Sequence, residues 1–323
     1  MGPTFGPSST ERPSNVHPYL IQIPMPWGAT FRIPSYGVML MCGFLLSLYI
    51  AQRRAKRLHI GANDVFDAAV AMLVAGVVGS RVFFVVAQWH RFRANPFDII
   101  RIDKGGLVFY GGLIGGAAVL LFIVVRKKLR LFPVLDLVMS VVPLGHAFGR
   151  MGCFLNGCCF GKITRSWIGV RFPRILSDGN LGMPLYDVGD QYIAGSPPFL
   201  YHLDQTPPLI QKTAEWSLPV HPTQLYAVGY NLLIFAAVSL WFHRRWGRNG
   251  TGGARAGEVA WIYAILYGSF RFGNEFLRVT RAVLLGMTIA QVICVPLVIL
   301  GVVMFVRGRL RPLQPLPEST ASD

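Results

Sequence analysis

Long apolar runs alternate with short polar segments along most of the 323-residue chain. Runs of about 20 apolar residues are long enough to cross the hydrocarbon core of a bilayer as α-helices. Seven stretches fit or approach this length: 35–51, 65–89, 107–125, 131–148, 225–242, 258–272 and 284–306. The sixth is short and becomes polar at its end, so hydropathy supports it least. The pattern predicts an all-α polytopic membrane protein with seven transmembrane helices.

Basic residues gather in the short loops after the first, third and fifth predicted helices. These residues are Arg53, Arg54, Lys56, Arg57, then Arg126, Lys127, Lys128, Arg130, and then Arg244, Arg245, Arg248, Arg255. Short cytoplasmic loops of membrane proteins are rich in Lys and Arg. We therefore expect the N-terminus outside the cytoplasm and the C-terminus inside, which agrees with an odd number of helices.

The orientation divides the chain into five segments. They are an extracytoplasmic N-terminal segment (1–34), helices 1–4 with the signature motif (35–161), an extracytoplasmic head (162–220), helices 5–7 (221–306) and a cytoplasmic tail (307–323). The head is too polar to enter lipid, and structureless loops of its length are uncommon, so we expect a small, partly stranded unit. The first segment lacks a signal-peptide pattern, and the Pro-rich tail is expected to be disordered.

Composition agrees with a membrane protein. Hydrophobic residues make up 53% of the chain and charged residues 14%, against about 25% charged residues in soluble domains. The net charge of +16 comes from 31 basic and 15 acidic residues. Because the sequence has no zinc-finger spacing and no RNP-like motif, this charge suits anionic lipid rather than nucleic acid. The lipid bilayer is thus an expected partner and nucleic acid is not.

The segment 149–161 brings an arginine, an asparagine and three cysteines to the predicted border of the membrane. Ionisable groups at membrane depth are costly, and their presence there indicates function. A buried Arg150 needs an anionic partner, and the predicted fourth helix offers only Asp136, about 20 Å away along its axis. Arg150 is therefore a candidate anion-binding residue.

Two helical faces carry further candidates. Tyr267, Arg271 and Glu275 follow each other at intervals of four residues, with Arg278 three residues further on. Two arginines for one carboxylate leave positive charge that suits a phosphate, although a simple Arg–Glu pair joining two helices remains an alternative.

His146, Arg150 and Cys153 share a face of the fourth predicted helix. A hydrogen-bonded histidine between helices is the simpler interpretation of His146 by itself. Glycines at 111, 112, 115 and 116 form two small-xxx-small pairs, which predict that the third helix packs closely against a neighbour.

The segment 149–161 resembles the signature of the prolipoprotein diacylglyceryl transferase family, Gly-Arg-x-Gly-Asn-Phe-x-Asn-Gly-Glu followed by a further glycine. The matching residues are Gly149, Arg150, Gly152, Phe154, Asn156, Gly157 and Gly161. Cys153 stands where the family usually has Asn, and Cys158 stands where it usually has Glu.

Four other motifs and one partial match extend this resemblance from about residue 36 to residue 278. They are Tyr36-Gly37, Gly79-Ser80-Arg81, His221-Pro222-Thr223-Gln224-Leu225-Tyr226, Tyr267-Gly268-Ser269-Phe270-Arg271-Phe272 with Glu275 and Arg278, and Tyr110-Gly111-Gly112-Leu113-Ile114-Gly115. In the last of these Tyr110 replaces the family's histidine. The motifs occur in the family's order.

The resemblance implies transfer of a diacylglyceryl group from phosphatidylglycerol to the lipobox cysteine of a prolipoprotein, in the bacterial inner membrane and without cofactor or metal. The implied residues for phosphatidylglycerol are Arg150, Arg271, Asn156, Tyr36, Tyr267, Glu275 and Arg278. Arg150, Arg271, Tyr110 and His146 are the expected catalytic residues. Tyrosine, with a reference pKa of about 10, is a poor base at neutral pH, so we expect His146 to take over part of the proton handling.

Two other classes of function remain open. One is a membrane thiol-redox or metal-binding enzyme that uses Cys153, Cys158 and Cys159. It is less favoured because redox pairs are usually Cys-x-x-Cys and adjacent cysteines pair only with strain. The other is a lipid-binding or transport protein without catalysis. Cys42 and Cys294 lie in apolar runs and are expected to be small buried side chains.

Overall fold

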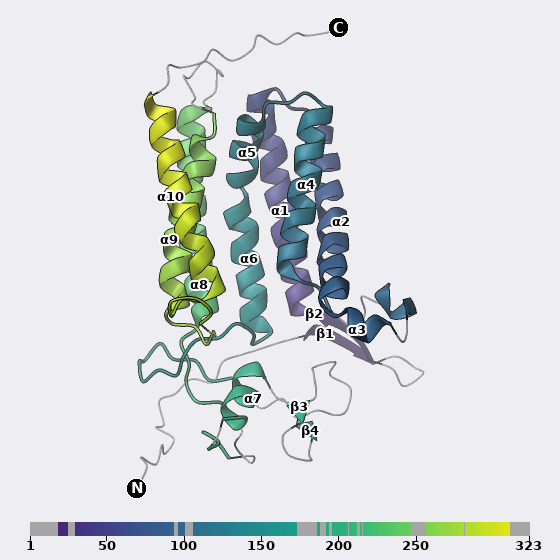
Figure 1. Ribbon diagram of the computed structural model, residues 1–323, viewed down its shortest axis with the longest axis vertical. Coiled ribbons are helices and arrows are strands. Elements are labelled where there is room, and N and C mark those ends of the chain that lie inside the picture. The colour runs from purple at the N-terminus through teal and green to yellow at the C-terminus, as the bar shows by residue number, and fades with distance from the viewer. Residues whose placement is uncertain are drawn as a thin grey trace. The chain divides into compact units, whose positions relative to one another are not determined.

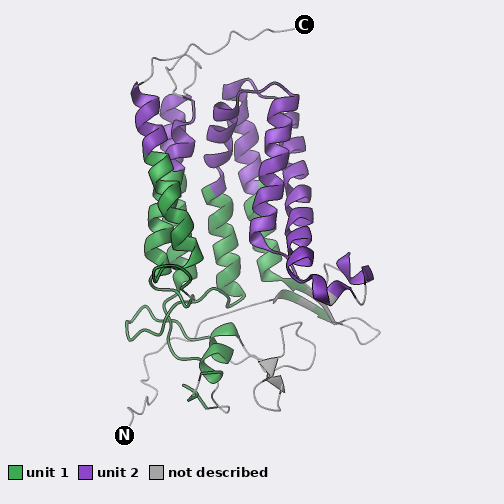
Figure 2. Ribbon diagram, viewed as in Figure 1, with its two compact units in different colours: residues 1–45, 143–236, 264–302 green, residues 46–142, 237–263, 303–323 purple. Residues whose placement is uncertain are grey.

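The chain divides into two compact units in the computed structural model (Figure 2). Unit 1 comprises Met1–Leu45, Pro143–Ala236 and Ala264–Val302, and unit 2 comprises Leu46–Val142, Ala237–Tyr263 and Val303–Asp323. The structure describes residues 19–24, 30–93, 96–100, 106–172, 186–187, 192–193, 196–205, 207–211, 214, 216–246, 256–280 and 282–310. The expectations for residues 1–18, for part of the head, for Arg248 and Arg255, and for the tail from residue 311 lie outside this range.

Each of the seven apolar stretches contains helix (Figure 1). The long helices are α1 (Ser35–Ala55), α2 (Ala62–Ala87), α4 (Phe109–Arg126), α5 (Leu131–Met139), α6 (Val142–Leu155), α8 (Thr223–Arg245), α9 (Glu258–Glu275) and α10 (Ile289–Leu310). Shorter helices are η1 (Lys56–Leu58), α3 (Trp89–Phe92), η2 (Pro96–Ile99) and α7 (Pro197–Leu203).

Six helical stretches among the described residues are long and apolar enough to cross a membrane. They comprise α1 with η1, α2, α4, α5 together with α6, α8, and α10. The chain is therefore a multi-pass membrane protein. Helix α9 is 18 residues long but carries Arg271, Asn274 and Glu275 in its last turns, so its transmembrane character stays a prediction.

The exposed surface of α2 is apolar, as expected for a helix in lipid. Val74, Val78 and Val86 are 57%, 56% and 70% exposed. Exposure to lipid also explains why one prediction about the cysteines is wrong. Cys42 on α1 is exposed, whereas Cys294 on α10 is buried as predicted. An apolar run in a membrane helix does not have to face the protein interior.

The predicted helix 131–148 is not continuous, because it breaks between α5 and α6 and then extends to Leu155. Pro143 has no N–H to donate to the carbonyl four residues earlier, so the helix loses a hydrogen bond at this point and is weakened there. Arg54 supplies a hydrogen-bond donor at the break, because its Nη1 donates to the Ser140 carbonyl at 2.8 Å. Its Nη2 donates to Ser239 Oγ at 2.7 Å. The sequence had assigned Arg54 only to a cytoplasmic loop, yet the side chain is buried.

Asp136 fixes the start of α9 within unit 2. Its buried carboxylate accepts the backbone N–H groups of Gly257 at 2.8 Å and Ala260 at 3.0 Å. A carboxylate at this position satisfies amides that have no partner inside the helix and complements the helix dipole.

Short antiparallel hairpins accompany the helices. The first pairs β1 (Tyr19–Pro24) with β2 (Thr30–Pro34), and the second pairs β3 (Tyr186–Asp187) with β4 (Tyr192–Ile193). The described part of the head has two small cores. Phe172 and Val220 form one, and Phe199, Leu200 and Leu203 form the other.

Helices α2 and α4 lie side by side in unit 2 and approach through their glycines (Figure 1). A Cβ added at Gly79 would lie 2.4 Å from the carbonyl oxygen of Gly111, and one added at Gly115 would lie 2.4 Å from that of Ala75. Real Cβ atoms do not approach other atoms this closely, so only glycine permits the two backbones to lie at this separation. The close packing predicted from the small-xxx-small pattern is confirmed.

This packing predicts different effects for two adjacent glycines. We expect Gly115→Ala to lower the free energy of unfolding by about 1–3 kcal/mol, because the new methyl group meets a backbone oxygen that cannot rotate away. Gly116→Ala is the matched control, since its Cβ would lie 3.7 Å from the nearest atom. Thermal unfolding of both variants in detergent measures the difference, and equal midpoints would contradict the proposed helix contact.

Candidate functional site

Helix α6 ends in a turn that determines the geometry of the signature segment. The amide of Gly157 donates to the carbonyl of Phe154, and the amide of Cys158 donates to the carbonyl of Cys153, both at 3.0 Å. With Gly157 at φ 72°, these bonds form a Schellman motif, which brings the side chains at its two ends into contact. Glycine is needed because it adopts a left-handed backbone without strain. The turn therefore places Cys153 beside Cys158.

Cys159 continues the turn with another left-handed backbone, at φ 62°, which is uncommon for a residue other than glycine. The first turn of α8 holds it there. Gln224 Nε2 donates to the Cys158 carbonyl at 2.7 Å, and Thr223 Oγ1 donates to the Cys159 carbonyl at 2.8 Å. Both donor side chains are buried. The surroundings thus fix the backbone that brings the third thiol to the other two.

The three thiols form a compact cluster. Their sulfur atoms all lie within 4.8 Å of one another, with Cys153 buried and the other two half-buried. All five cysteines of the chain fall within the described residues and are free thiols. Hydrogen bonds from Cys153 and Cys158, followed by the guanidinium groups of Arg278 and Arg150, lower the pKa of Cys159. Hydrogen bonding with Cys153 and Cys159 raises the pKa of Cys158, so Cys159 is the thiol that ionises first.

His146 and Arg150 lie one turn apart on α6, both half-buried. The His146 ring stacks on Tyr267 of α9, with ring centroids 5.1 Å apart and an interplanar angle of 30°. Tyr36 of α1 packs against Gly152, where an added Cβ would lie 2.9 Å from the tyrosine ring. Two of the predicted tyrosines therefore pack against α6 near the predicted arginine.

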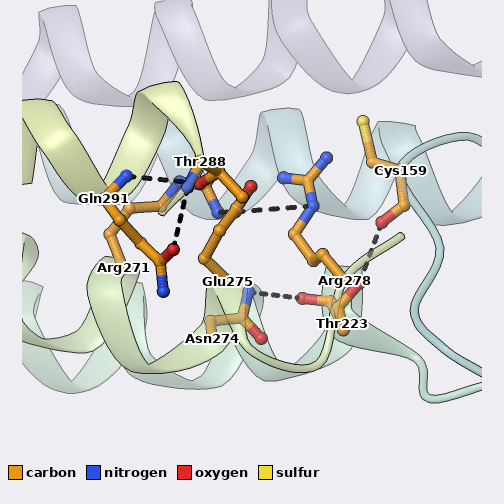
Figure 3. Close-up of polar contacts among 8 residues, drawn as sticks. All are labelled: Cys159, Thr223, Arg271, Asn274, Glu275, Arg278, Thr288 and Gln291. Carbon is orange, nitrogen blue, oxygen red and sulfur yellow. Dashed lines mark hydrogen bonds and ion pairs between the residues drawn. The ribbon is translucent and has the colours of Figure 1, made fainter. Parts of the chain in front are cut away.

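At the end of α9, two arginines share one carboxylate (Figure 3). Arg271 Nη1 pairs with Glu275 Oε2, and Arg278 Nε lies 3.8 Å from the same oxygen. The Glu275 side chain is 1% exposed, and those of Arg271 and Arg278 are 12% and 15% exposed. Figure 3 shows the Arg278 side chain between Glu275 and Cys159. Two cations and one anion leave one positive charge in poor contact with solvent.

Gly161 joins the signature segment to the end of α9. Its amide donates to the His221 carbonyl at 3.0 Å, and the amide of Lys162 donates to the Leu277 carbonyl at 2.7 Å. A Cβ at Gly161 would lie 2.6 Å from the His221 oxygen and 2.7 Å from the Leu277 oxygen. Only glycine permits this approach of three backbones, which keeps Arg278 next to the cysteine turn.

Eight of the nine predicted site residues belong to unit 1: Tyr36, His146, Arg150, Asn156, Tyr267, Arg271, Glu275 and Arg278. Asn156 lies immediately before the glycine of the turn and is half-buried. Tyr110 belongs to unit 2, where it lies on α4, is 41% exposed and contacts the Phe109 ring edge-on. Its participation in the site stays a prediction.

Sequence reasoning missed the residues that support the site. Thr223 and Gln224 were recognised as part of a motif but not as the donors that fix the cysteine turn. Asn274 Nδ2 donates to the Thr223 carbonyl at 3.2 Å, which ties α9 to α8.

At the start of α10, Thr288 and Gln291 form reciprocal hydrogen bonds: the Thr288 amide donates to Gln291 Oε1 at 3.0 Å, and the Gln291 amide donates to Thr288 Oγ1 at 3.3 Å. Their Thr-x-x-Gln spacing is that of a capping box and was readable from the sequence.

Comparisons with known proteins identify the family of this chain. The family model described as "Prolipoprotein diacylglyceryl transferase" matches residues 21–307. Relatives named phosphatidylglycerol–prolipoprotein diacylglyceryl transferase occur in several bacteria. The Clostridium tetani protein is 28% identical over 281 residues, which cover 87% of this chain and 95% of the relative. The Streptococcus agalactiae protein is 29% identical over 280 residues (86% and 93%), and the Xylella fastidiosa protein is 32% identical over 306 residues (88% and 92%).

These matches cover nearly the whole of each relative and all of the motifs that surround the two arginine positions and the cysteine turn. The chain belongs to the prolipoprotein diacylglyceryl transferase family.

Proposed function

We propose that this chain transfers the diacylglyceryl group of phosphatidylglycerol to the lipobox cysteine of prolipoproteins, the first step of bacterial lipoprotein maturation. The cysteine sulfur loses its proton and forms a C–S thioether with the diacylglyceryl carbon. The C–O bond to the phosphate breaks, and glycerol phosphate leaves with the electron pair. Family membership supports this reaction, and the observation that carries it is the uncompensated positive charge around Glu275.

A second buried carboxylate, Glu258 in unit 2, provides a comparison. It also pairs with two arginines, Arg245 at 2.9 Å and Arg309 at 3.1 Å. These side chains are 30% and 41% exposed, so solvent can stabilise their excess charge. The two arginines that share Glu275 are much less exposed. Their excess charge requires an anion that the pair itself does not supply.

The phosphodiester of phosphatidylglycerol is a suitable anion. A guanidinium group binds two phosphate oxygens at once, which a lysine ammonium does not. In our proposal Arg150 and Arg271 hold the phosphate, and Glu275 fixes the orientation of Arg271. Tyr36, Asn156, Tyr267 and Arg278 contact the headgroup. The same guanidinium groups stabilise the negative charge that grows on the leaving group, which is usually a large contribution to catalysis.

The acceptor thiol must also lose its proton, because the thiolate is the nucleophile. A neutral imidazole can accept that proton, and we assign this role to His146, whose ring is positioned by Tyr267. Tyr110 occupies the place of the family's histidine in the sequence, and on that ground alone we keep it as a catalytic candidate.

The membrane arrangement is part of the proposal. We assign α9 as a further membrane span, which gives seven spans with the N-terminus outside, the C-terminus in the cytoplasm and the head 162–220 outside. Basic loops after α1, α4 and α8 support this orientation. The membrane would be the bacterial inner membrane, where phosphatidylglycerol and precursor proteins meet.

Purified protein incubated with phosphatidylglycerol and a lipobox peptide separates this proposal from its rivals. A transferase adds a diacylglyceryl group to the peptide, which mass spectrometry detects. A lipid-binding or transport protein retains the lipid and leaves the peptide unchanged. A thiol-redox enzyme changes the oxidation state of its substrate instead.

The two arginines give the first test within this assay. We expect Arg150→Ala and Arg271→Ala each to lower the transfer rate by about 100-fold or more, because each removes a donor to developing charge. Arg150→Lys and Arg271→Lys should retain more activity than the alanine variants, because lysine keeps the positive charge but cannot bind two phosphate oxygens at once. The exposed Arg93 serves as a control through Arg93→Ala. Full activity in either alanine variant would remove that arginine from the mechanism.

The pH–rate profile tests the assignment of the proton acceptor. We expect His146→Gln to lower the transfer rate and to change the shape of the profile, because a glutamine side chain cannot accept a proton from the acceptor thiol. If Tyr110→His restores activity in the His146→Gln background, the two positions serve one proton. An unchanged rate and profile in His146→Gln would show that thiol ionisation depends on the arginines alone.

A further inference from the structure

The cysteine cluster occupies two positions at which the family signature usually has Asn and Glu, and the transfer reaction outlined above leaves all three thiols without a role. Among the described residues, Cys153, Cys158 and Cys159 are the only group of three His, Cys, Asp or Glu side chains close enough to hold a metal ion. We propose that these residues bind one Zn²⁺ ion through three thiolates and leave a fourth coordination position open to an external thiol.

The geometry favours a metal over a disulfide. Zinc–sulfur bonds are about 2.3 Å long, so thiolates around a tetrahedral zinc ion are separated by about 3.8 Å. The three sulfur atoms already lie within 4.8 Å of one another. Rotations about the Cα–Cβ bonds that displace the sulfur atoms by about 1 Å bring them to this separation. The backbone does not have to move, because the Schellman turn and the side chains of Thr223 and Gln224 already fix it. A disulfide would engage two of the thiols and leave the third without a partner.

The charge balance also favours the ion. Three thiolates and one Zn²⁺ carry a net charge of −1, and Figure 3 shows the Arg278 side chain next to Cys159, with Arg150 on the same helix as Cys153. The arginines would thus face an anionic complex and not an isolated cation. Binding replaces three S–H protons with one metal ion and releases the protons to the buffer. Zinc affinity should therefore rise with pH, and no oxidant or reductant takes part.

Three protein ligands are the number that zinc ions with an open position usually have, whereas structural zinc ions usually have four. Two of the three cysteines are half-buried, so a ligand from outside can approach the ion. A thiol is the ligand that a zinc ion among thiolates accepts, and coordination deprotonates it. The identity of this ligand as the acceptor cysteine rests on the proposed function. The bound ion would favour the thiolate form of that cysteine, and its proton would pass to His146, the acceptor assigned above.

Zinc content after equilibrium dialysis of the full-length protein, kept reduced in detergent, tests the metal site. We expect one zinc ion per wild-type chain, with affinity that increases with pH. Loss of a residue that only hydrogen-bonds to a metal ligand typically lowers metal affinity about 10–100-fold. Cys158→Ser removes a ligand itself, so its zinc affinity should fall by more than this. Cys42→Ser is the matched control, because Cys42 is exposed on α1 and lies outside the cluster. Equal zinc binding by wild type and Cys158→Ser, or none by either, would overturn the proposal.

A second measurement needs no variant and so does not depend on the folding of Cys158→Ser. Zinc should protect Cys153, Cys158 and Cys159 of the wild-type protein from alkylation while Cys42 reacts at an unchanged rate. The absence of such protection would also overturn the site.

Cobalt substitution tests the open position. The thiolate-to-cobalt absorption of the Co²⁺ form should change when a lipobox peptide is added and stay unchanged with the Cys→Ser peptide. An unchanged spectrum with both peptides would refute the open position. Peptide lipidation by zinc-free protein would refute the role of the metal while leaving the transferase intact. Zinc binding without any lipidation would refute the transferase while leaving the metal site intact.

Discussion

A charged group inside a protein in a membrane must have a partner, and this requirement determines most of the polar structure of the chain. Three carboxylates are buried among the described residues, at Asp136, Glu258 and Glu275. Asp136 accepts two backbone amides, and each of the glutamates meets two guanidinium groups. The three sites differ in their excess positive charge. Asp136 is bonded to uncharged backbone amides, so its site has none. The two arginines at Glu258 expose their excess charge to solvent, whereas the two arginines at Glu275 are shielded from solvent.

Because the excess positive charge of Arg271 and Arg278 is shielded from solvent, we propose the end of α9 as the position of an anionic headgroup. The backbone around it is organised for close approach, since Gly161 lets the signature segment touch both the start of α8 and the end of α9. Arg278, which shares Glu275 with Arg271, thereby lies beside the cysteine turn. The arginines of α9 that we propose for phosphate binding and the cysteine cluster consequently belong to one unit, although they lie more than 100 residues apart along the chain.

Much of this arrangement was predictable from the sequence. Hydropathy located every long helix, the small-xxx-small pattern predicted the contact of α2 with α4, and the four-residue spacing of Arg271 and Glu275 predicted their ion pair. The break after Met139 escaped because an apolar run gives no sign of where a helix stops, although Pro143 was a readable signal. The burial of Arg54 was not predictable, because its neighbours in the sequence are basic while its hydrogen-bond partners lie 86 and 185 residues away.

In the proposed mechanism the poorly solvated guanidinium groups hold a phosphatidylglycerol molecule whose headgroup leaves during transfer. The most direct measurement follows both products in one reaction, with a label in the headgroup glycerol and mass detection of the lipobox peptide. We expect soluble labelled glycerol phosphate and thioether-linked peptide to form in equal amounts, and a Cys→Ser peptide to yield neither product. Folded protein that retains phosphatidylglycerol but releases no glycerol phosphate in the presence of the cysteine peptide would contradict this mechanism.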